Sequence, residues 1–223
     1  FFAMKKYLIF LLLCNIFLCF SLYSQTSKVN KRVESIIDSI LIDFNDKSPG
    51  AAVLVLHNNK ILFCKGYGLA NLENKDRINK YTNFRLASIS KQFTAMCIMI
   101  LKERGKLKYE NSIKDIFPEF PDYGSKITIK HLLQHTSGLI DYEDMMPDTQ
   151  TTQVHDNDVL KMMMSIDSTY FIPGSKFKYS NSGYAILAMI VEKTSGKKYA
   201  EFLRENIFKP LKMKNSVAYE KGI

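Results

Sequence analysis

The chain contains 223 residues, 46% of them hydrophobic, which is enough to bury the core of at least one domain. Lysine and arginine outnumber the acidic residues and give a net charge of +9, but they are dispersed along the sequence and form no basic stripe with interleaved aromatic residues. This distribution argues against a nucleic-acid partner, and four cysteines without a C-x-x-C pair argue against a disulfide framework or a zinc site.

Residues 1–24 have the layout of a secretory signal peptide. Two lysines precede an apolar run over residues 7–20, and small and polar residues follow it. We expect Met4 to be the start and cleavage to occur near Ser24, so that residues 25–223 are secreted or periplasmic. An uncleaved membrane anchor is the alternative, because the run is close to the shortest length that spans a bilayer. Cys14 and Cys19 are expected to leave with the signal, and Cys64 and Cys97 are expected to be buried free thiols.

Residues 25–86 predict one helix and the first strands of a sheet. Apolar residues at helical spacing from Val29 to Phe44 predict an amphipathic helix. The continuous apolar run over residues 51–56 predicts a buried strand. Residues 61–67 predict the second arm of a hairpin, and the polar segment that follows it is expected to be irregular.

Residues 87–223 are predicted to be mainly helical. The helix that follows Ser88 is apolar nearly all round, which predicts a buried central helix that ends near Gly105. Residues 141–157 are acidic and polar without periodicity, and we expect a surface loop near the cleft. Further helices are expected over residues 128–134, 159–166, 184–196 and 199–207.

The sequence Ser88-Ile89-Ser90-Lys91 is the first candidate for chemistry. A serine hydroxyl is a weak nucleophile and needs a neighbouring base, and a lysine three residues later on a helix lies on the same face. The same spacing occurs at Ser175/Lys178 and at Ser195/Lys198, but neither of these pairs begins a helix. The alternative is that Ser88 only caps a core helix.

A Tyr-x-Asn pair is the second candidate, because residues two apart in an extended segment point the same way. It occurs at residues 81/83, at 109/111 and as Tyr179/Asn181. The last pair directly precedes a predicted buried helix. A lysine ammonium would lower the pKa of Tyr179, and Asn181 could orient the lysine or a substrate amide. The alternative is a simple turn with a tyrosine over it.

Together these stretches resemble the serine β-lactamase-like family, which includes class C β-lactamases, D-alanyl-D-alanine carboxypeptidases and related esterases. The matching segments are residues 84–95, 127–139 and 173–184, and the similarity extends from about residue 30 to the end. The resemblance implies an α+β fold in which an antiparallel sheet is flanked by helices and carries a helical subdomain.

The resemblance also implies roles for individual residues. Ser88 would attack a carbonyl and form an acyl-enzyme, with its backbone N–H as one oxyanion donor. Lys91 would accept the hydroxyl proton or assist its removal electrostatically. Tyr179 would relay that proton to the leaving group and later activate water. Asn181 would bind the substrate and hold Lys91. No metal or other cofactor is implied.

One element of the family pattern has no counterpart. Family members carry a Lys/His-x-Gly triplet on a later strand, and nothing with that spacing follows Asn181. We therefore expect residues 25–223 to be the N-terminal part of a truncated domain that lacks the C-terminal strands of its sheet. Activity of this chain by itself is not implied.

Two other functions are open to this sequence. His131 and His135 have a metal-ligand spacing on a helix, but Leu132 stands where a zinc protease has glutamate, so structural roles are favoured. No G-x-S-x-G occurs, which disfavours an α/β-hydrolase. An exported serine hydrolase acting on an amide, lactam or ester, with a small molecule or peptide as its substrate, is therefore the leading interpretation. A non-catalytic sensor of cell-wall peptides or β-lactams is the alternative.

Overall fold

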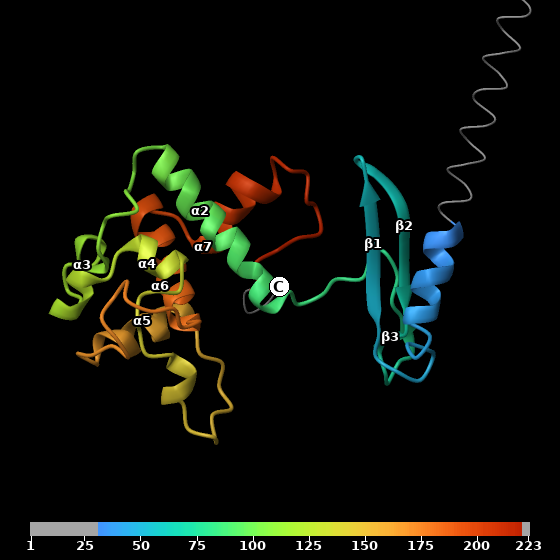
Figure 1. Ribbon diagram of the computed structural model, residues 1–223, viewed down its shortest axis with the longest axis horizontal. Coiled ribbons are helices and arrows are strands. Elements are labelled where there is room, and N and C mark those ends of the chain that lie inside the picture. The colour runs from blue at the N-terminus through green and yellow to red at the C-terminus, as the bar shows by residue number, and fades with distance from the viewer. Residues whose placement is uncertain (1–30, 220–223) are drawn as a thin grey trace, which may run out of the picture. The chain divides into compact units, whose positions relative to one another are not determined.

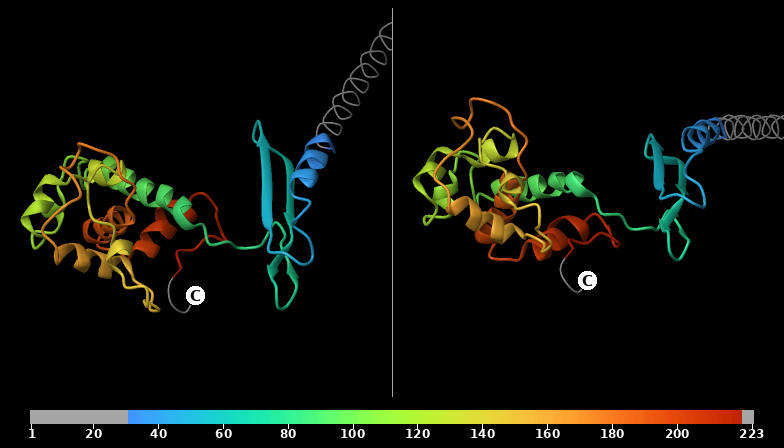
Figure 2. Two further views of the ribbon diagram at one scale, coloured as in Figure 1. Left: turned by 60° about the horizontal axis from the view of Figure 1, so that its bottom comes forward. Right: turned by 90° about the horizontal axis from the view of Figure 1, so that it is seen from below.

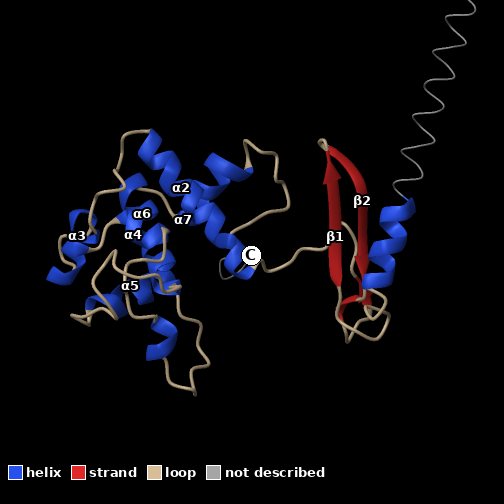
Figure 3. Cartoon of the chain, in the orientation of Figure 1, coloured by secondary structure: helices blue, strands red, loops and turns tan. Residues whose placement is uncertain are grey.

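The computed structural model describes residues 31–219 (Figure 1). The expected signal peptide, with Cys14 and Cys19, lies outside this range. The chain divides after Phe84 into two compact units. Figure 3 shows that the strands belong to the first unit and that helices and loops build the second. Among the helices within residues 31–219, none has the length and apolar character needed to cross a membrane.

The first unit consists of a helix beside a β-hairpin (Figure 2). The helix covers residues 31–40 of the described range, and the antiparallel strands are β1 (Ala51–His57) and β2 (Lys60–Tyr67). Asn58 and Asn59 have φ angles of 48° and 59°, the left-handed values that a tight hairpin turn requires. The segment expected to be irregular instead forms a small second hairpin of β3 (Leu69–Asn71) and β4 (Asp76–Arg77).

The prediction of a buried first strand is wrong. Burial alternates along β1, and Leu54 and Leu56 are 54% and 58% exposed. A two-stranded sheet needs cover on both faces to bury a continuous apolar run, and within the described part of this unit the helix covers one. Cys64 pairs with Leu54 across the hairpin and is exposed for the same reason, whereas Cys97 is buried as predicted.

The second unit is organised around α6 (Asn181–Ser195), which packs against five other helices. These are α2 (Lys91–Glu103), α3 (Ile113–Ile116), α4 (Ile129–Leu133), α5 (Asp156–Met164) and α7 (Tyr199–Leu203). Ile186, Leu187 and Ile190 of α6 are fully buried. The core of this unit therefore surrounds α6, whose own N-terminus follows Tyr179 by two residues.

The helix predicted to be central, α2, lies at the side of this core. Its buried residues include Cys97, Ile98 and Leu101, which face the rest of the unit, whereas Met96 and Met99 are 44% and 49% exposed. An apolar sequence on every side of a helix does not say which neighbours cover it. In the described residues of this unit, α6 and α7 contact α2 from one side.

Local hydrogen bonds fix where the helices begin. The Thr128 side chain accepts from the backbone N–H of His131 and starts α4, as predicted. The Ser180 hydroxyl accepts from the N–H of Gly183 and starts α6, so the chain before it stays extended. At the other end of α6, Gly196 has a φ of 71°, a left-handed value that few other residues adopt cheaply.

We expect Gly196→Ala to destabilise the second unit by about 1 kcal/mol, because an L side chain disfavours the left-handed conformation. No atom lies within 4 Å of the position that a Cβ would take at Gly196, so the cost is conformational rather than steric. Urea unfolding followed by circular dichroism measures the change. Gly196→Asn is the matched control and should cost less, since asparagine tolerates this conformation; equal losses would contradict the explanation.

Candidate active site

Ser88 lies in a 3-10 turn, Ala87–Ser90, that runs directly into α2. Residues three apart eclipse each other in such a turn, and the Lys91 Nζ donates to the Ser88 Oγ over 3.3 Å. Ala87 has a φ of 45°, a strained left-handed value for a residue with a side chain. The strained residue stands immediately before Ser88, whose side chain is exposed to solvent.

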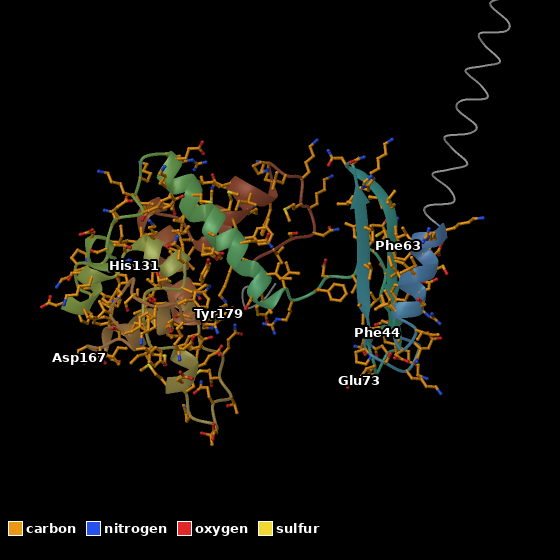
Figure 4. The ribbon with its side chains drawn as sticks, viewed as in Figure 1. Phe44, Phe63, Glu73, His131, Asp167 and Tyr179 are labelled. Carbon is orange, nitrogen blue, oxygen red and sulfur yellow. The ribbon has the colours of Figure 1, made fainter. Side chains whose placement is uncertain are left out.

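Tyr179 and Asn181 reach the same point from the segment that leads into α6. The Tyr179 hydroxyl lies 2.6 Å from the Ser88 Oγ, although the two residues are separated by 91 positions. The Lys91 Nζ donates to the Asn181 Oδ1 over 2.7 Å and lies 4.7 Å from the centre of the Tyr179 ring. Figure 4 marks Tyr179 in the helical unit. The structure thus brings all four predicted residues together.

The duplicate patterns have ordinary structural contacts. The Ser175 Oγ donates to the carbonyl of Ile172, and the Ser195 Oγ accepts from the N–H of Lys197. The Asn111 side chain accepts from the N–H of Lys108 and closes a turn. Ser88 and Tyr179 were chosen in the sequence because each stands just before a predicted helix. The pairs that contain them are the ones that lie together in the structure.

The environment of Tyr179 acts on its pKa in two directions. Burial raises the pKa of this phenol. Hydrogen bonds with Lys91 and Ser88 and the positive charge of Lys91 lower it, and together they leave the pKa below its ordinary value. An opposite charge within a few ångströms favours the ionised form of a group. Ionisation of Tyr179 to the phenolate therefore costs less free energy than ionisation of a free tyrosine.

Two carboxylates that the sequence did not single out orient Asn181. The backbone N–H of Asn181 donates to the Asp141 Oδ2 over 2.9 Å, and its Nδ2 donates to the Glu143 Oε1 over 3.1 Å. With its amide nitrogen engaged, the Asn181 side chain presents its oxygen to Lys91. Both acids lie in the segment expected only to be a loop near the cleft, and their spacing carried no signal of this contact.

The two histidines serve different parts of the backbone. His131 Nδ1 accepts from the N–H of Thr128 at the start of α4, over 3.3 Å. His135 Nδ1 accepts from the N–H of Ser180 over 3.1 Å, and its ring stacks on Tyr179 with centres 4.6 Å apart. Within residues 31–219, no three histidine, cysteine or acidic side chains converge on a point where a metal could bind.

A hollow of about 660 Å³ lies beside Asn181 and is lined by groups of both charges. Glu143 belongs to its wall and also contacts Asn181. Arg85 lies three positions before Ser88 and contributes a cation. The other lining residues are Tyr142, Met146, Pro147, Asp148, Gln150, Thr151, Thr152, Gln153 and Val154. The hollow therefore adjoins the four candidate residues through the contact of Glu143 with Asn181.

Comparison with known families gives one match that covers most of the chain. A model of the Beta-lactamase family matches residues 36–221. A penicillin-binding protein of Bacillus subtilis is 39% identical over 175 residues, which are 77% of this chain and 38% of that protein. Protein flp of Staphylococcus aureus is 32% identical over 174 residues, which are 75% of this chain and 34% of that protein. The chain therefore spans little more than a third of these relatives.

Solved structures share the fold. The octameric penicillin-binding protein homologue from Pyrococcus abyssi superposes with a TM-score of 0.69 at 28% identity, covering 82% of this chain and 43% of that one. The D-amino acid amidase from Ochrobactrum anthropi superposes with a TM-score of 0.63 at 29% identity, covering 73% of this chain and 44% of that one. The described helices and short antiparallel strands thus correspond to a part of the serine β-lactamase fold.

We expect Lys91→Met to raise the pKa of Tyr179 above its ordinary value of 10.0, because burial then acts without an opposing charge. Titration of the tyrosine ¹³Cζ signals by NMR measures the change, with Tyr179→Phe assigning the signal. Lys178→Met is the matched control, because the Lys178 ammonium lies over the ring of Tyr170. A Tyr179 pKa that both substitutions leave unchanged would contradict the electrostatic account.

Proposed function

The chain belongs to the Beta-lactamase family, and from this premise we propose that it carries the nucleophile of a serine hydrolase that works through an acyl-enzyme. The observation that carries the proposal is the position of the Ser88 Oγ, within hydrogen-bond distance of both the Tyr179 hydroxyl and the Lys91 ammonium. A hydroxyl with a base and a cation at this distance has the arrangement of an activated nucleophile.

The proposed reaction begins when the Ser88 Oγ attacks a carbonyl carbon. The Tyr179 phenolate takes the hydroxyl proton, and the Lys91 ammonium stabilises the phenolate before that transfer. The backbone N–H of Ser88 donates to the oxyanion of the tetrahedral intermediate. When the carbonyl re-forms, the bond to the leaving group breaks and Tyr179 returns the proton to it. A water activated by the same phenolate then releases the acyl group and regenerates Ser88.

Asn181 holds the Lys91 ammonium in position beside Tyr179. It accepts from the Lys91 ammonium, and the carboxylates of Asp141 and Glu143 hold it from the other side. The positive charge of Lys91 is therefore steered toward the phenol. No cofactor is needed in this scheme, because both the nucleophile and the proton carrier belong to the chain.

The proposed substrates are small molecules or peptides with a reactive carbonyl, namely amides, β-lactams or esters. Support comes from the names of the similar proteins, which include penicillin-binding proteins and a D-amino acid amidase. The hollow beside Asn181 offers space and charges of both signs for such a ligand. We place the protein in the periplasm or outside the cell on the pattern of residues 1–24.

We expect Ser88→Ala to abolish covalent labelling by a fluorescent penicillin or by a p-nitrophenyl ester, because no acyl bond can form. Gel fluorescence and mass spectrometry measure the label on the protein expressed from its complete gene. Ser175→Ala, which removes the hydroxyl of another Ser-x-x-Lys pair, is the matched control and should label like the unaltered protein. Undiminished labelling of the Ser88 variant would refute the assignment of the nucleophile.

The same reagents distinguish hydrolysis from sensing. A hydrolase releases product in excess of the enzyme concentration, whereas a covalent sensor takes up one label per molecule and stops. Turnover of the ester with a loss of label over time is the expected result. Stable labelling without product release would support the sensor of β-lactams or cell-wall peptides instead.

We expect Tyr179→Phe to lower the acylation rate constant by about 10²- to 10⁴-fold, the usual contribution of a positioned acid–base group. The ring and its stacking on His135 remain, so the melting temperature should change little. Stopped-flow measurement of the ester burst gives the rate constant. Tyr109→Phe alters the tyrosine of another Tyr-x-Asn pair and serves as the control; a similar loss in both variants would argue against a proton carrier at residue 179.

A further inference from the structure

His135 holds the segment that carries Tyr179 from two sides. Its backbone carbonyl accepts from the N–H of Lys178 over 2.9 Å, and its ring nitrogen Nδ1 accepts from the N–H of Ser180 over 3.1 Å. These two bonds bracket Tyr179, which lies between the bonded residues. The imidazole itself stacks on the Tyr179 ring at an interplanar angle of 25°.

The backbone of His135 adopts a strained conformation in this arrangement. Its φ of 57° is a left-handed value, unfavourable for a residue other than glycine. Strain of this kind persists where surrounding contacts fix the conformation, and it often accompanies functional positions. At His135 the strained backbone directs both the carbonyl and the ring toward residues 178–180.

Tyr179 needs an external support of this kind. The residue is 43% exposed and Phe177, on the same segment, is 70% exposed, so neither side chain is anchored in the hydrophobic core. The phenol nevertheless has to meet the Ser88 Oγ at 2.6 Å. A stacked ring and two bracketing hydrogen bonds can hold such a position where core packing does not.

We propose that neutral His135 is a positioning residue that fixes the Tyr179 phenol against Ser88, and that protonation of His135 releases it. The bond from Ser180 requires a lone pair on Nδ1, which exists only while that nitrogen carries no proton. The importance of this position for acylation rests on the function proposed above. The positioning itself concerns the geometry of Tyr179 and can be tested without turnover.

The charges around His135 favour its neutral form. Lys91 of α2 faces it together with Tyr179 and with Tyr184 of α6, whose ring centre lies 5.1 Å from that of His135. The nearby carboxylates, Asp141 and Glu143, are engaged by Asn181. Burial, followed by the charge of Lys91, lowers the pKa of His135 below its ordinary value of 6.5. The neutral form therefore persists at neutral pH, and the release occurs only as the pH falls below 6.5.

The test compares His135→Leu and His135→Asn in the whole chain. Leucine fills similar space without an acceptor, whereas the asparagine oxygen can take the place of Nδ1 and does not titrate. We expect His135→Leu to return the pKa of Tyr179 toward that of a free tyrosine, and His135→Asn to keep it lowered. NMR titration of the Tyr179 ¹³Cζ signal measures this. An unchanged pKa in the leucine variant would overturn the proposal.

The matched control is His131→Leu, which removes the same type of bond, from a backbone N–H to a histidine Nδ1, at the start of α4. Figure 4 shows His131 well apart from Tyr179. We expect this variant to lose stability without changing the Tyr179 pKa. If His131→Leu and His135→Leu shift that pKa equally, the effect is general loosening of the fold and the proposal fails.

The Tyr179 NMR signal at acid pH supplies the second readout. In the unaltered chain, we expect the Tyr179 signal to shift a second time at acid pH, together with the titration of the His135 ring, and to lack this shift in His135→Asn. Persistence of the shift in the asparagine variant would contradict a role for His135. If the leucine variant does not fold, this comparison still decides between the two outcomes.

The acylation rate separates this proposal from the function on which it rests. We expect a loss of about tenfold or more for His135→Leu, because small misplacements of a reacting group cost orders of magnitude in rate. His135→Asn should retain most of the rate. If the unaltered protein takes no label at all, the proposed function fails, while the Tyr179 titrations still decide whether His135 positions the phenol.

Discussion

The proposed chemistry of this protein depends on one oxygen atom that lies within hydrogen-bond distance of two partners. The Ser88 Oγ lies 2.6 Å from the Tyr179 hydroxyl and 3.3 Å from the Lys91 ammonium. The first partner belongs to the segment before α6 and the second to the start of α2. The arrangement therefore exists only while α2 packs against α6, and the buried side chains between these helices serve the site as well as the fold.

The start of α6 is held by contacts from several directions. Ser180 caps the helix, His135 binds the N–H of Ser180, and Asp141 binds the N–H of Asn181. A carboxylate near a helix N-terminus is favourable, because free N–H groups and the helix dipole give that end a positive potential. The negative charges of Asp141 and Glu143 balance the positive charge of Lys91, to which Asn181 connects them. Residues 178–181, where an extended segment becomes a buried helix, therefore serve both the fold and the proposed chemistry.

Much of the local structure could be predicted from the sequence. The Asn58-Asn59 turn, the Thr128 cap and the end of α6 at Gly196 all follow from the residues themselves. Burial could not be predicted in the same way. The apolar sequences of β1 and α2 indicated buried elements, but burial depends on which neighbours cover each face. Leu54 and Met99 are exposed because the described neighbours cover the opposite faces.

The sequence by itself determined the family, the local pairing of Ser88 with Lys91 and the order of the helices, because spacing and caps act between residues that are close along the chain. It also indicated Tyr179 and Asn181, although their roles remain predictions. Only the tertiary structure decided that Asp141, Glu143 and His135 support these residues. Hydrogen bonds between segments 38 to 45 positions apart leave no periodic pattern, since packing rather than sequence distance brings their partners together.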